Sequence, residues 1–428
     1  MKQKALSHLF VSFKDFLAKK SVFLHLLITQ ISLQPNQLQD TPKSKTKAME
    51  GVSEGPDRKI LIVGMSESPH LQTWIQGIAQ AGVASKLWLF PSDLPKQRHH
   101  NSNINVREFP YINFGYLTKI VFKVLDVITN RHWRSYFLYR EINRIKPTHL
   151  HFHETQHGAY LYNSISSHPK NTFQGKIILS TWGSDLIHYA TLENHRLRIQ
   201  KVLSWVDLLT SERLEDFDIA VEHGFTGNFF APIYTTVGNR NSNIKLSQSS
   251  QRTLVLVKGY EDNHGRALNA LASIEIVAAQ MDLSKFNFRI FSASKSVKRK
   301  VKGMRKTLDL NIKVLPKMPK HEFLNYYKEA RVYLGLAISD GLSTSMVEAM
   351  SFGSFPIQSS NSSAPEFLIN GVTGGVVDPY DIAGTAAQLM EALRNDELVD
   401  QAAIANFQTI RAKYNWDLGI QKIVELYD

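Results

Sequence analysis

Two acidic side chains, Asp340 and Glu348, flank the start of a predicted helix. Asp340 and Gly341 form a turn signal, and Ser343 or Thr344 can then serve as the helix N-cap. The free N–H groups and the dipole of a helix N-terminus favour a bound phosphate. Carboxylates accept hydrogen bonds from the hydroxyl groups of a sugar or a ribose. This combination predicts a binding site for a nucleotide-sugar.

The stretch from Asp340 to Ile357 resembles the donor-binding signature of the retaining GT-B glycosyltransferases of family 4. That signature has two Glu residues separated by seven others, and this chain has Asp340 in place of the first Glu. The remaining matches are Glu348, Ala349, Met350, Gly353, Pro356 and Ile357. The resemblance implies that Asp340 holds hydroxyl groups of the transferred sugar and that Glu348 holds the ribose. The alternative is that the Glu-Ala-Met triplet is only a good helix former.

The segment after the next predicted strand, residues 355–358, also resembles the family. In the family, a loop in this place is followed by a Glu, two Gly residues and an Asp. This chain has Glu366, Gly371, either Gly374 or Gly375, and Asp378 at the matching positions. The family often has two glycines where this chain has Ser362 and Ser363. The resemblance implies a donor-binding role for Glu366.

Two cations, Lys258 and Arg266, lie where the family has a strand followed by an Arg and a Lys that bind the donor diphosphate. The resemblance implies that role for both, although their order is reversed. Such cations neutralise the charge that grows on the leaving group. The alternative is a pair of surface cations at the entry of a helix.

Histidines gather on and after the predicted strand 149–153. His151 and His153 share one side of that strand, and His157 follows in the loop. The spacing would permit a metal site, but no acid cluster accompanies it, so no metal is expected. One of these histidines is expected to line the cleft, and His153 is the catalytic candidate. A core histidine is the alternative.

Two further loops suggest the acceptor side of the site. The sequence STWGSDLIHYA resembles the family's Thr-x-His-Gly-x-Asp loop, with Trp182 in place of His and with Gly183 and Asp185 matching. Asp185 could orient an acceptor hydroxyl or cap the following helix. In the first strand-to-helix loop, His70 would face the cleft and contact acceptor or phosphate; a capping or solvated histidine is the alternative.

Apolar runs closed by turn residues alternate with helical patterns along the chain. The predicted strands are 59–64, 86–90, 149–153, 176–181, 207–210, 253–258, 287–291, 312–315, 332–336 and 355–358. This alternation predicts an α/β protein with two Rossmann-like, doubly wound domains that face a cleft. The predicted parts are a tail (1–55), an acceptor domain (56–235), a linker (236–252), a donor nucleotide-sugar domain (253–410) and a final helix (411–428). The family resemblance implies that this helix crosses back to the first domain.

Composition limits the function classes. The 428 residues include no cysteine, which excludes disulfides and is compatible with a reducing cytoplasm. The net charge of +12 favours an anionic partner. No nucleic-acid-binding module is recognisable, which leaves diphosphate-linked substrates and anionic lipid.

Two segments could contact a membrane surface. Residues 1–55 begin with lysines among apolar residues, so they could form an amphipathic surface helix; equally, Met49 could be the true start. The segment 116–146 mixes cations with aromatic residues. This pattern indicates either a helix that rests on an anionic membrane surface or a helix whose aromatic residues face the protein core. The run 295–306 predicts an exposed cationic helix.

We therefore expect a retaining glycosyltransferase of hexosyltransferase type. It would move a sugar from a nucleotide-diphosphate-sugar to a glycan or lipid-linked acceptor in surface polysaccharide biosynthesis, in the cytoplasm or at the inner face of the membrane. The expectation includes no cofactor besides this donor, no metal and no nucleic acid. The alternatives are a non-hydrolysing sugar-nucleotide epimerase and a non-catalytic binding subunit.

Overall fold

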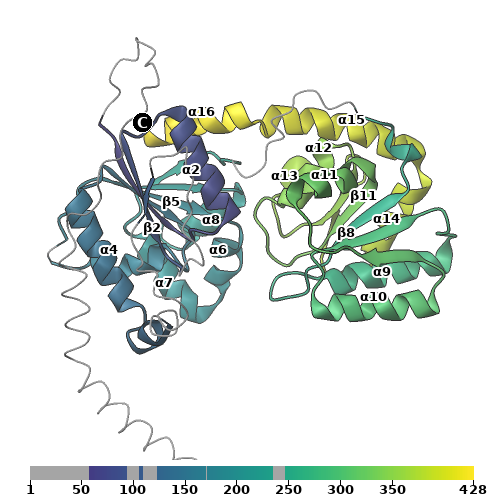
Figure 1. Ribbon diagram of the computed structural model, residues 1–428, viewed down its shortest axis with the longest axis horizontal. Helices are drawn as coiled ribbons and strands as arrows, with labels where there is room; N and C mark the ends of the chain where they lie inside the picture. The colour runs from purple at the N-terminus through teal and green to yellow at the C-terminus, as the bar shows by residue number, and fades with distance from the viewer. Residues whose placement is uncertain (1–56, 94–105, 109–122, 170, 235–245) are drawn as a thin grey trace, which may run out of the picture. The chain divides into compact units, whose positions relative to one another are not determined.

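Strands and helices alternate along the part of the chain that the computed structural model describes, namely residues 57–93, 106–108, 123–169, 171–234 and 246–428 (Figure 1). Within these residues the strands form two separate sheets, and every strand pairing is parallel. The predicted α/β class is confirmed. The tail, residues 1–55, lies outside the described residues.

The first sheet has the order β3-β2-β1-β4-β5-β6-β7. Its strands are β1 (Lys59–Gly64), β2 (Lys86–Pro91), β3 (Val106–Glu108), β4 (His149–His153), β5 (Lys176–Thr181), β6 (Leu208–Ser211) and β7 (Asn228–Phe230). The central strand β1 is a continuous apolar run because both faces of a parallel sheet are covered. Its residues Ile60 and Val63 are fully buried.

The longer helices of this domain are α2 (Pro69–Ala81), α4 (His132–Ile145), α7 (Glu193–Leu203) and α8 (Glu215–Glu222), with short helices α5 (Asn163–Ser166) and α6 (Ser184–Ile187). Gly82, with φ of 64°, ends α2 as a left-handed cap. The helical segment predicted for 116–146 is interrupted: Asn130 and Arg131 have positive φ, and α4 begins at His132. Residues 116–122 lie outside the described part.

The second sheet has the order β10-β9-β8-β11-β12-β13. Its strands are β8 (Leu254–Lys258), β9 (Asn287–Phe291), β10 (Asn311–Val314), β11 (Ala330–Gly335), β12 (Phe355–Ser359) and β13 (Gly375–Val377). The helices are α9 (Ala267–Gln280), α10 (Lys295–Thr307), α11 (Lys320–Glu329), α12 (Thr344–Ser351), α13 (Ala364–Phe367), α14 (Ile382–Arg394) and α15 (Asp396–Lys413). Figure 1 shows α9 and α10 on one face of this sheet and α11 and α12 on the other.

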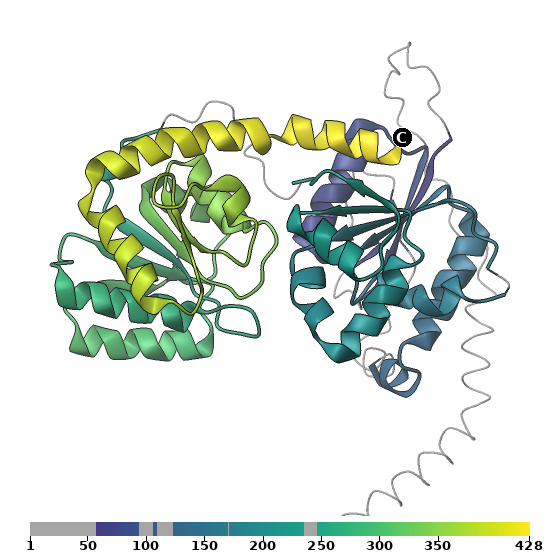
Figure 2. The same cartoon turned by 180° about the vertical axis from the view of Figure 1, so that it is seen from behind.

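The last helix, α16 (Trp416–Tyr427), packs against α2 in the first domain (Figures 1 and 2). The two helices approach closely at Gly77, where an added Cβ would lie 2.5 Å from Cδ1 of Ile423. Trp74 donates from Nε1 to the hydroxyl of Tyr427 at 3.3 Å. The end of the chain therefore completes the core of the first domain.

None of the described helices is both long enough and apolar enough to cross a bilayer.

Candidate active site

Helix α12 presents its N-terminus at the carboxyl edge of the second sheet. Ser343 is its N-cap residue, with extended backbone and no side-chain capping bond. The Ser343 hydroxyl is buried and has no hydrogen-bond partner among the described residues. Gly353, with φ of 80°, follows the C-cap residue Phe352 at the other end of the helix. The first-turn N–H groups of such a helix have no intrahelical acceptor, so they can bind an anion.

Lys258 and Asp340 meet beside this helix. Lys258 ends β8, and Asp340 follows the neighbouring strand β11, so both lie at the carboxyl edge of one parallel sheet. Lys258 Nζ lies 3.2 Å from Oδ2 of Asp340. Burial alone would lower the pKa of Lys258, but the charge and hydrogen bond of Asp340, together with the nearby Tyr333 and Tyr260, raise that pKa overall. Lys258 is therefore charged throughout the physiological range.

A cavity of about 410 Å³ opens at this pair, a volume within the range of small-molecule sites. Five residues suggested by the sequence line it: His70, Trp182, Lys258, Asp340 and Thr344. No sequence motif pointed to the other lining residues, which are Glu212, Tyr260, Phe291, Ser292, Leu342 and Ser345. The cavity thus has both cationic and anionic groups on its walls.

Glu212 is the most notable residue that sequence reasoning missed. It directly follows β6 and is only 6% exposed. Its Oε2 accepts a hydrogen bond from the backbone N–H of Leu342 at 3.1 Å, and its Oε1 lies 3.7 Å from Nδ1 of His70. An acid immediately after a buried strand was the available signal.

His70 stands at the start of α2, and its ring lies 5.2 Å from the Trp182 ring. Burial would lower the pKa of His70, yet the carboxylate of Glu212, supported by Asp340, raises it overall. The side chain can therefore carry a positive charge into the cavity.

His153 packs against Trp182 and does not line the cavity. It is fully buried, and neither ring nitrogen has a hydrogen-bond partner among the described residues. Its ring packs against Trp74 at 5.1 Å and Trp182 at 5.5 Å. Burial, with the charge of His70, lowers the pKa of His153 to about 3. The imidazole is neutral at physiological pH and supports the Trp182 side of the site.

Asp185 holds loops of its own domain together. One carboxylate oxygen accepts from the N–H and hydroxyl of Thr155 at 2.6 and 2.8 Å, and the other accepts from the N–H of Trp182 at 2.7 Å. Burial raises the pKa of Asp185 despite these bonds. Of the two roles considered for it, this geometry favours positioning of the Trp182 loop over contact with an acceptor.

Gly183 and Gly341 allow two loops of different domains to touch. Gly183 has φ of 78°, and a Cβ on it would collide with the backbone nitrogen of Gly341. Nearby, the hydroxyl groups of Ser184 and Ser339 are hydrogen-bonded at 2.9 Å. The loop 339–342 is thus held against the Trp182 loop.

The loop 359–364 supports the loop 339–342 from its other flank. Asp340 donates its backbone N–H to the carbonyl of Asn361 at 3.0 Å, and Ser363 donates to the carbonyl of Gly341 at 3.1 Å. The serines that replace the family's glycines, Ser362 and Ser363, are buried in this contact.

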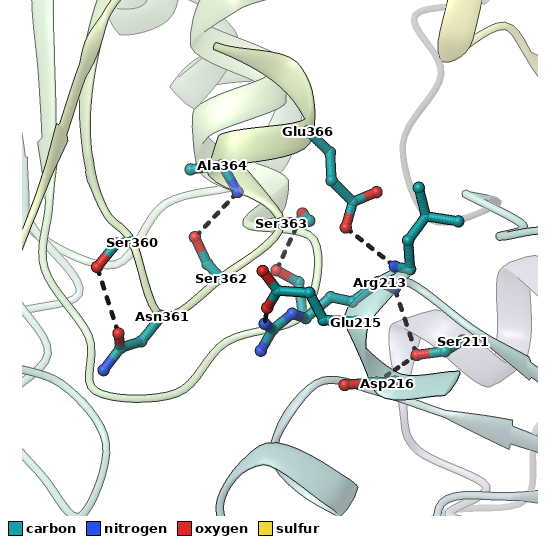
Figure 3. Close-up of polar contacts among 12 residues, drawn as sticks. Ser211, Arg213, Glu215, Asp216, Ser360, Asn361, Ser362, Ser363, Ala364 and Glu366 are labelled. Carbon is teal, nitrogen blue, oxygen red and sulfur yellow. Dashed lines mark hydrogen bonds and ion pairs between the residues drawn. The ribbon is translucent and has the colours of Figure 1, made fainter. Parts of the chain in front are cut away.

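Glu366 bonds to two residues of the first domain and does not line the cavity. Its Oε1 accepts from the N–H of Leu214 at 3.0 Å (Figure 3), and its Oε2 accepts from the hydroxyl of Tyr234 at 3.1 Å. Burial raises the pKa of Glu366. In the same close-up, Arg213 pairs with Glu215.

The remaining candidates, Glu348 and Arg266, lie outside the cavity lining. Glu348 is on α12, and its Oε1 pairs with Nζ of Lys320 at 2.7 Å. Arg266 precedes α9 and donates to the hydroxyl of Tyr380 at 3.3 Å. Among the described residues, no group of three His, Asp or Glu side chains is arranged to hold a metal ion.

Residues 244–408 match the family described as glycosyl transferases group 1. No curated protein matches the sequence. A sucrose-phosphate synthase from Thermosynechococcus elongatus is similar in structure, with a TM-score of 0.62 and 14% identity, covering 86% of this chain and 98% of that chain.

Two other solved structures are similar over the same share of this chain. A UDP-forming alpha,alpha-trehalose-phosphate synthase from Burkholderia xenovorans, in complex with glucose-6-phosphate, has a TM-score of 0.63, 12% identity and coverage of 86% and 100%. The HepE protein of Anabaena, in complex with UDP and glucose, has a TM-score of 0.60, 12% identity and coverage of 86% and 98%.

Proposed function

We propose that this chain, which has the GT-B fold and whose residues 244–408 match glycosyl transferases group 1, moves a sugar from a nucleotide-diphosphate-sugar to a glycan or lipid-linked acceptor with retention of configuration. The single observation that carries the proposal is the Lys258–Asp340 pair at the N-terminus of α12, inside one cavity. A cation, a helix end and a carboxylate together match a diphosphate joined to a polyhydroxyl ring.

In the proposed complex, the donor diphosphate lies between Lys258 and the first turn of α12. Asp340 accepts hydrogen bonds from hydroxyls of the transferred sugar, and Glu348 accepts from the ribose. Because Lys258 is held in place by Asp340, its charge is already positioned before the donor arrives. Arg266 would assist from the start of α9.

The reaction exchanges one bond at the anomeric carbon for another. The acceptor hydroxyl oxygen attacks that carbon, the bond to the diphosphate oxygen breaks, and the hydroxyl proton passes to the leaving phosphate. Negative charge grows on the phosphate as the bond breaks, so Lys258 and the helix end stabilise the transition state more than the bound donor. Attack on the same face as departure gives retention.

The acceptor is proposed to approach from the first domain, where His70 and Trp182 line the cavity. The contact of Gly183 with Gly341 limits access of water from that side. We propose surface polysaccharide synthesis as the setting.

The test begins with thermal unfolding of the purified protein in UDP-, GDP- and ADP-sugars, since a bound donor stabilises the fold. UDP-sugars come first because structural relatives were solved with UDP or form it. Transfer is then assayed on glycan and lipid-linked acceptors. Conversion of donor without acceptor would instead indicate an epimerase, and binding without any conversion would indicate a non-catalytic subunit.

A further inference from the structure

The carboxylate of Glu212 bridges two segments that the proposed reaction needs in fixed positions. One oxygen holds the backbone of Leu342, two residues after Asp340, and the other faces His70 at 3.7 Å. The side chain is 8% exposed and lines the cavity beside Lys258. A buried carboxylate at a site for a diphosphate is costly unless a cation compensates it.

The charges that face His70 show which cation is available. From the second domain, Lys258 and Asp340 act on it, but these two are paired with each other at 3.2 Å. From its own domain, the Trp182 ring covers it, and His153 behind is neutral. Glu212 is thus left with His70 as its counter-charge.

We propose that Glu212 is a positioning residue that holds His70 as an imidazolium in the cavity and holds the Asp340–Leu342 loop through its backbone. Through His70 it supplies a second cation beside the donor diphosphate. The inference rests on the proposed function for its effect on turnover, but not for its effect on His70. It also explains how an acid is tolerated beside an anion site.

The substitution Glu212→Gln separates the two contacts. The amide oxygen can still accept from the Leu342 N–H, whereas the negative charge beside His70 is lost. Glu222→Gln on α8 is the matched control, because Glu222 is exposed and does not line the cavity. Glu212→Asp keeps the charge on a shorter side chain.

The first experiment needs no donor. The imidazole of His70 is titrated by NMR in the parent and in both Gln variants, and His70→Gln identifies the signal. We expect the titration midpoint to fall by about one pH unit or more in Glu212→Gln and to stay unchanged in Glu222→Gln. Equal midpoints in all three proteins would overturn the proposal.

The second experiment measures kcat/KM for the donor against pH. In Glu212→Gln we expect a loss of about tenfold or more, with the alkaline limb moved to lower pH because His70 loses its proton earlier. Glu212→Asp should recover part of the loss. A uniform decrease with an unmoved pH profile would contradict the assigned role. If the parent transfers no sugar, the proposed function fails while the NMR result still decides the Glu212–His70 relationship.

Discussion

Nζ of Lys258 and Oδ2 of Asp340 form an ion pair at 3.2 Å. Lys258 is the last residue of β8, and Asp340 lies in the loop that follows the adjacent strand β11. The proposed phosphate-binding cation and the proposed sugar-binding acid are therefore one electrostatic unit. Removing either partner changes the charge that the other presents to the donor. Variants of the two should differ in which part of the donor they affect.

Lys258→Ala should weaken binding of a nucleoside diphosphate by about 1.5 to 3 kcal/mol, the range for a bond to a charged group. Binding of the nucleoside alone should stay unchanged, because the proposed complex places the ribose at Glu348 and not at Lys258. Calorimetry with both ligands checks this. Lys300→Ala, on α10 and paired with Glu275, is the control. If Lys258→Ala binds both ligands as the parent does, the phosphate site must lie elsewhere, at His70 or the 361–363 loop.

Asp340→Asn should reduce turnover of the donor without weakening the binding of the nucleoside diphosphate. Its affinity for the diphosphate should even increase, since Lys258 loses its partner within the chain. Asp340→Glu should retain activity. Steady-state kinetics and calorimetry together provide the measurement, and a parallel loss of diphosphate and nucleotide-sugar affinity would refute the division of roles.

Glu348→Gln should weaken donor binding by about 1.5 to 3 kcal/mol, since a neutral amide replaces a charged acceptor of ribose hydroxyls. The same carboxylate pairs with Lys320, which is 68% exposed. Lys320→Gln is the control, and it should change donor affinity by less than about 1 kcal/mol because exposed ion pairs contribute little. Unchanged donor affinity in Glu348→Gln would remove the ribose assignment.

Gly183→Ala should lower both the stability of the fold and kcat/KM. The left-handed backbone alone costs a non-glycine residue about 1 kcal/mol. Gly224→Ala carries the same backbone penalty, with φ of 89° and open space around the added Cβ. We expect a larger fall in melting temperature and a loss of kcat/KM in Gly183→Ala, where the Cβ would lie 1.9 Å from the backbone nitrogen of Gly341, and nearly unchanged kcat/KM in Gly224→Ala. Equal activity in both would show that the loops need not touch during turnover.

His153→Phe should reduce the pH dependence of stability in acid. The pKa of His153 is about 3 in the folded protein against an ordinary 6.5, so between these values the unfolded chain binds more protons. The free energy of unfolding therefore rises with pH across this window and loses this contribution as pH falls through it. Urea unfolding between about pH 4 and 7 should show a shallower slope in His153→Phe. Parallel curves would contradict neutral burial of this ring.

The sequence predicts β1, β4, β5 and β9 with their observed bounds. Continuous apolar residues mark β1 and β5, whereas polar and apolar residues alternate in β4 and β9. It misses β3, β7 and β13, which have three residues each and are too short to show a periodicity. It predicts α12 and its flanking acids from a local motif. By contrast, the approach of Glu212 to His70 joins segments far apart in the chain, and only the packed fold brings them together.

The docking of α16 on α2 has a consequence for how the protein is made. The hydroxyl of Tyr427 bonds to Trp74 and to His151, so the first domain lacks part of its core until residues 416–427 have left the ribosome. The second domain, by contrast, has all its strands and helices through α15 before α16 emerges. Co-translational folding should therefore complete the later domain before the earlier one. A stop codon that removes α16 would therefore damage the first domain, although the second domain would keep all its strands.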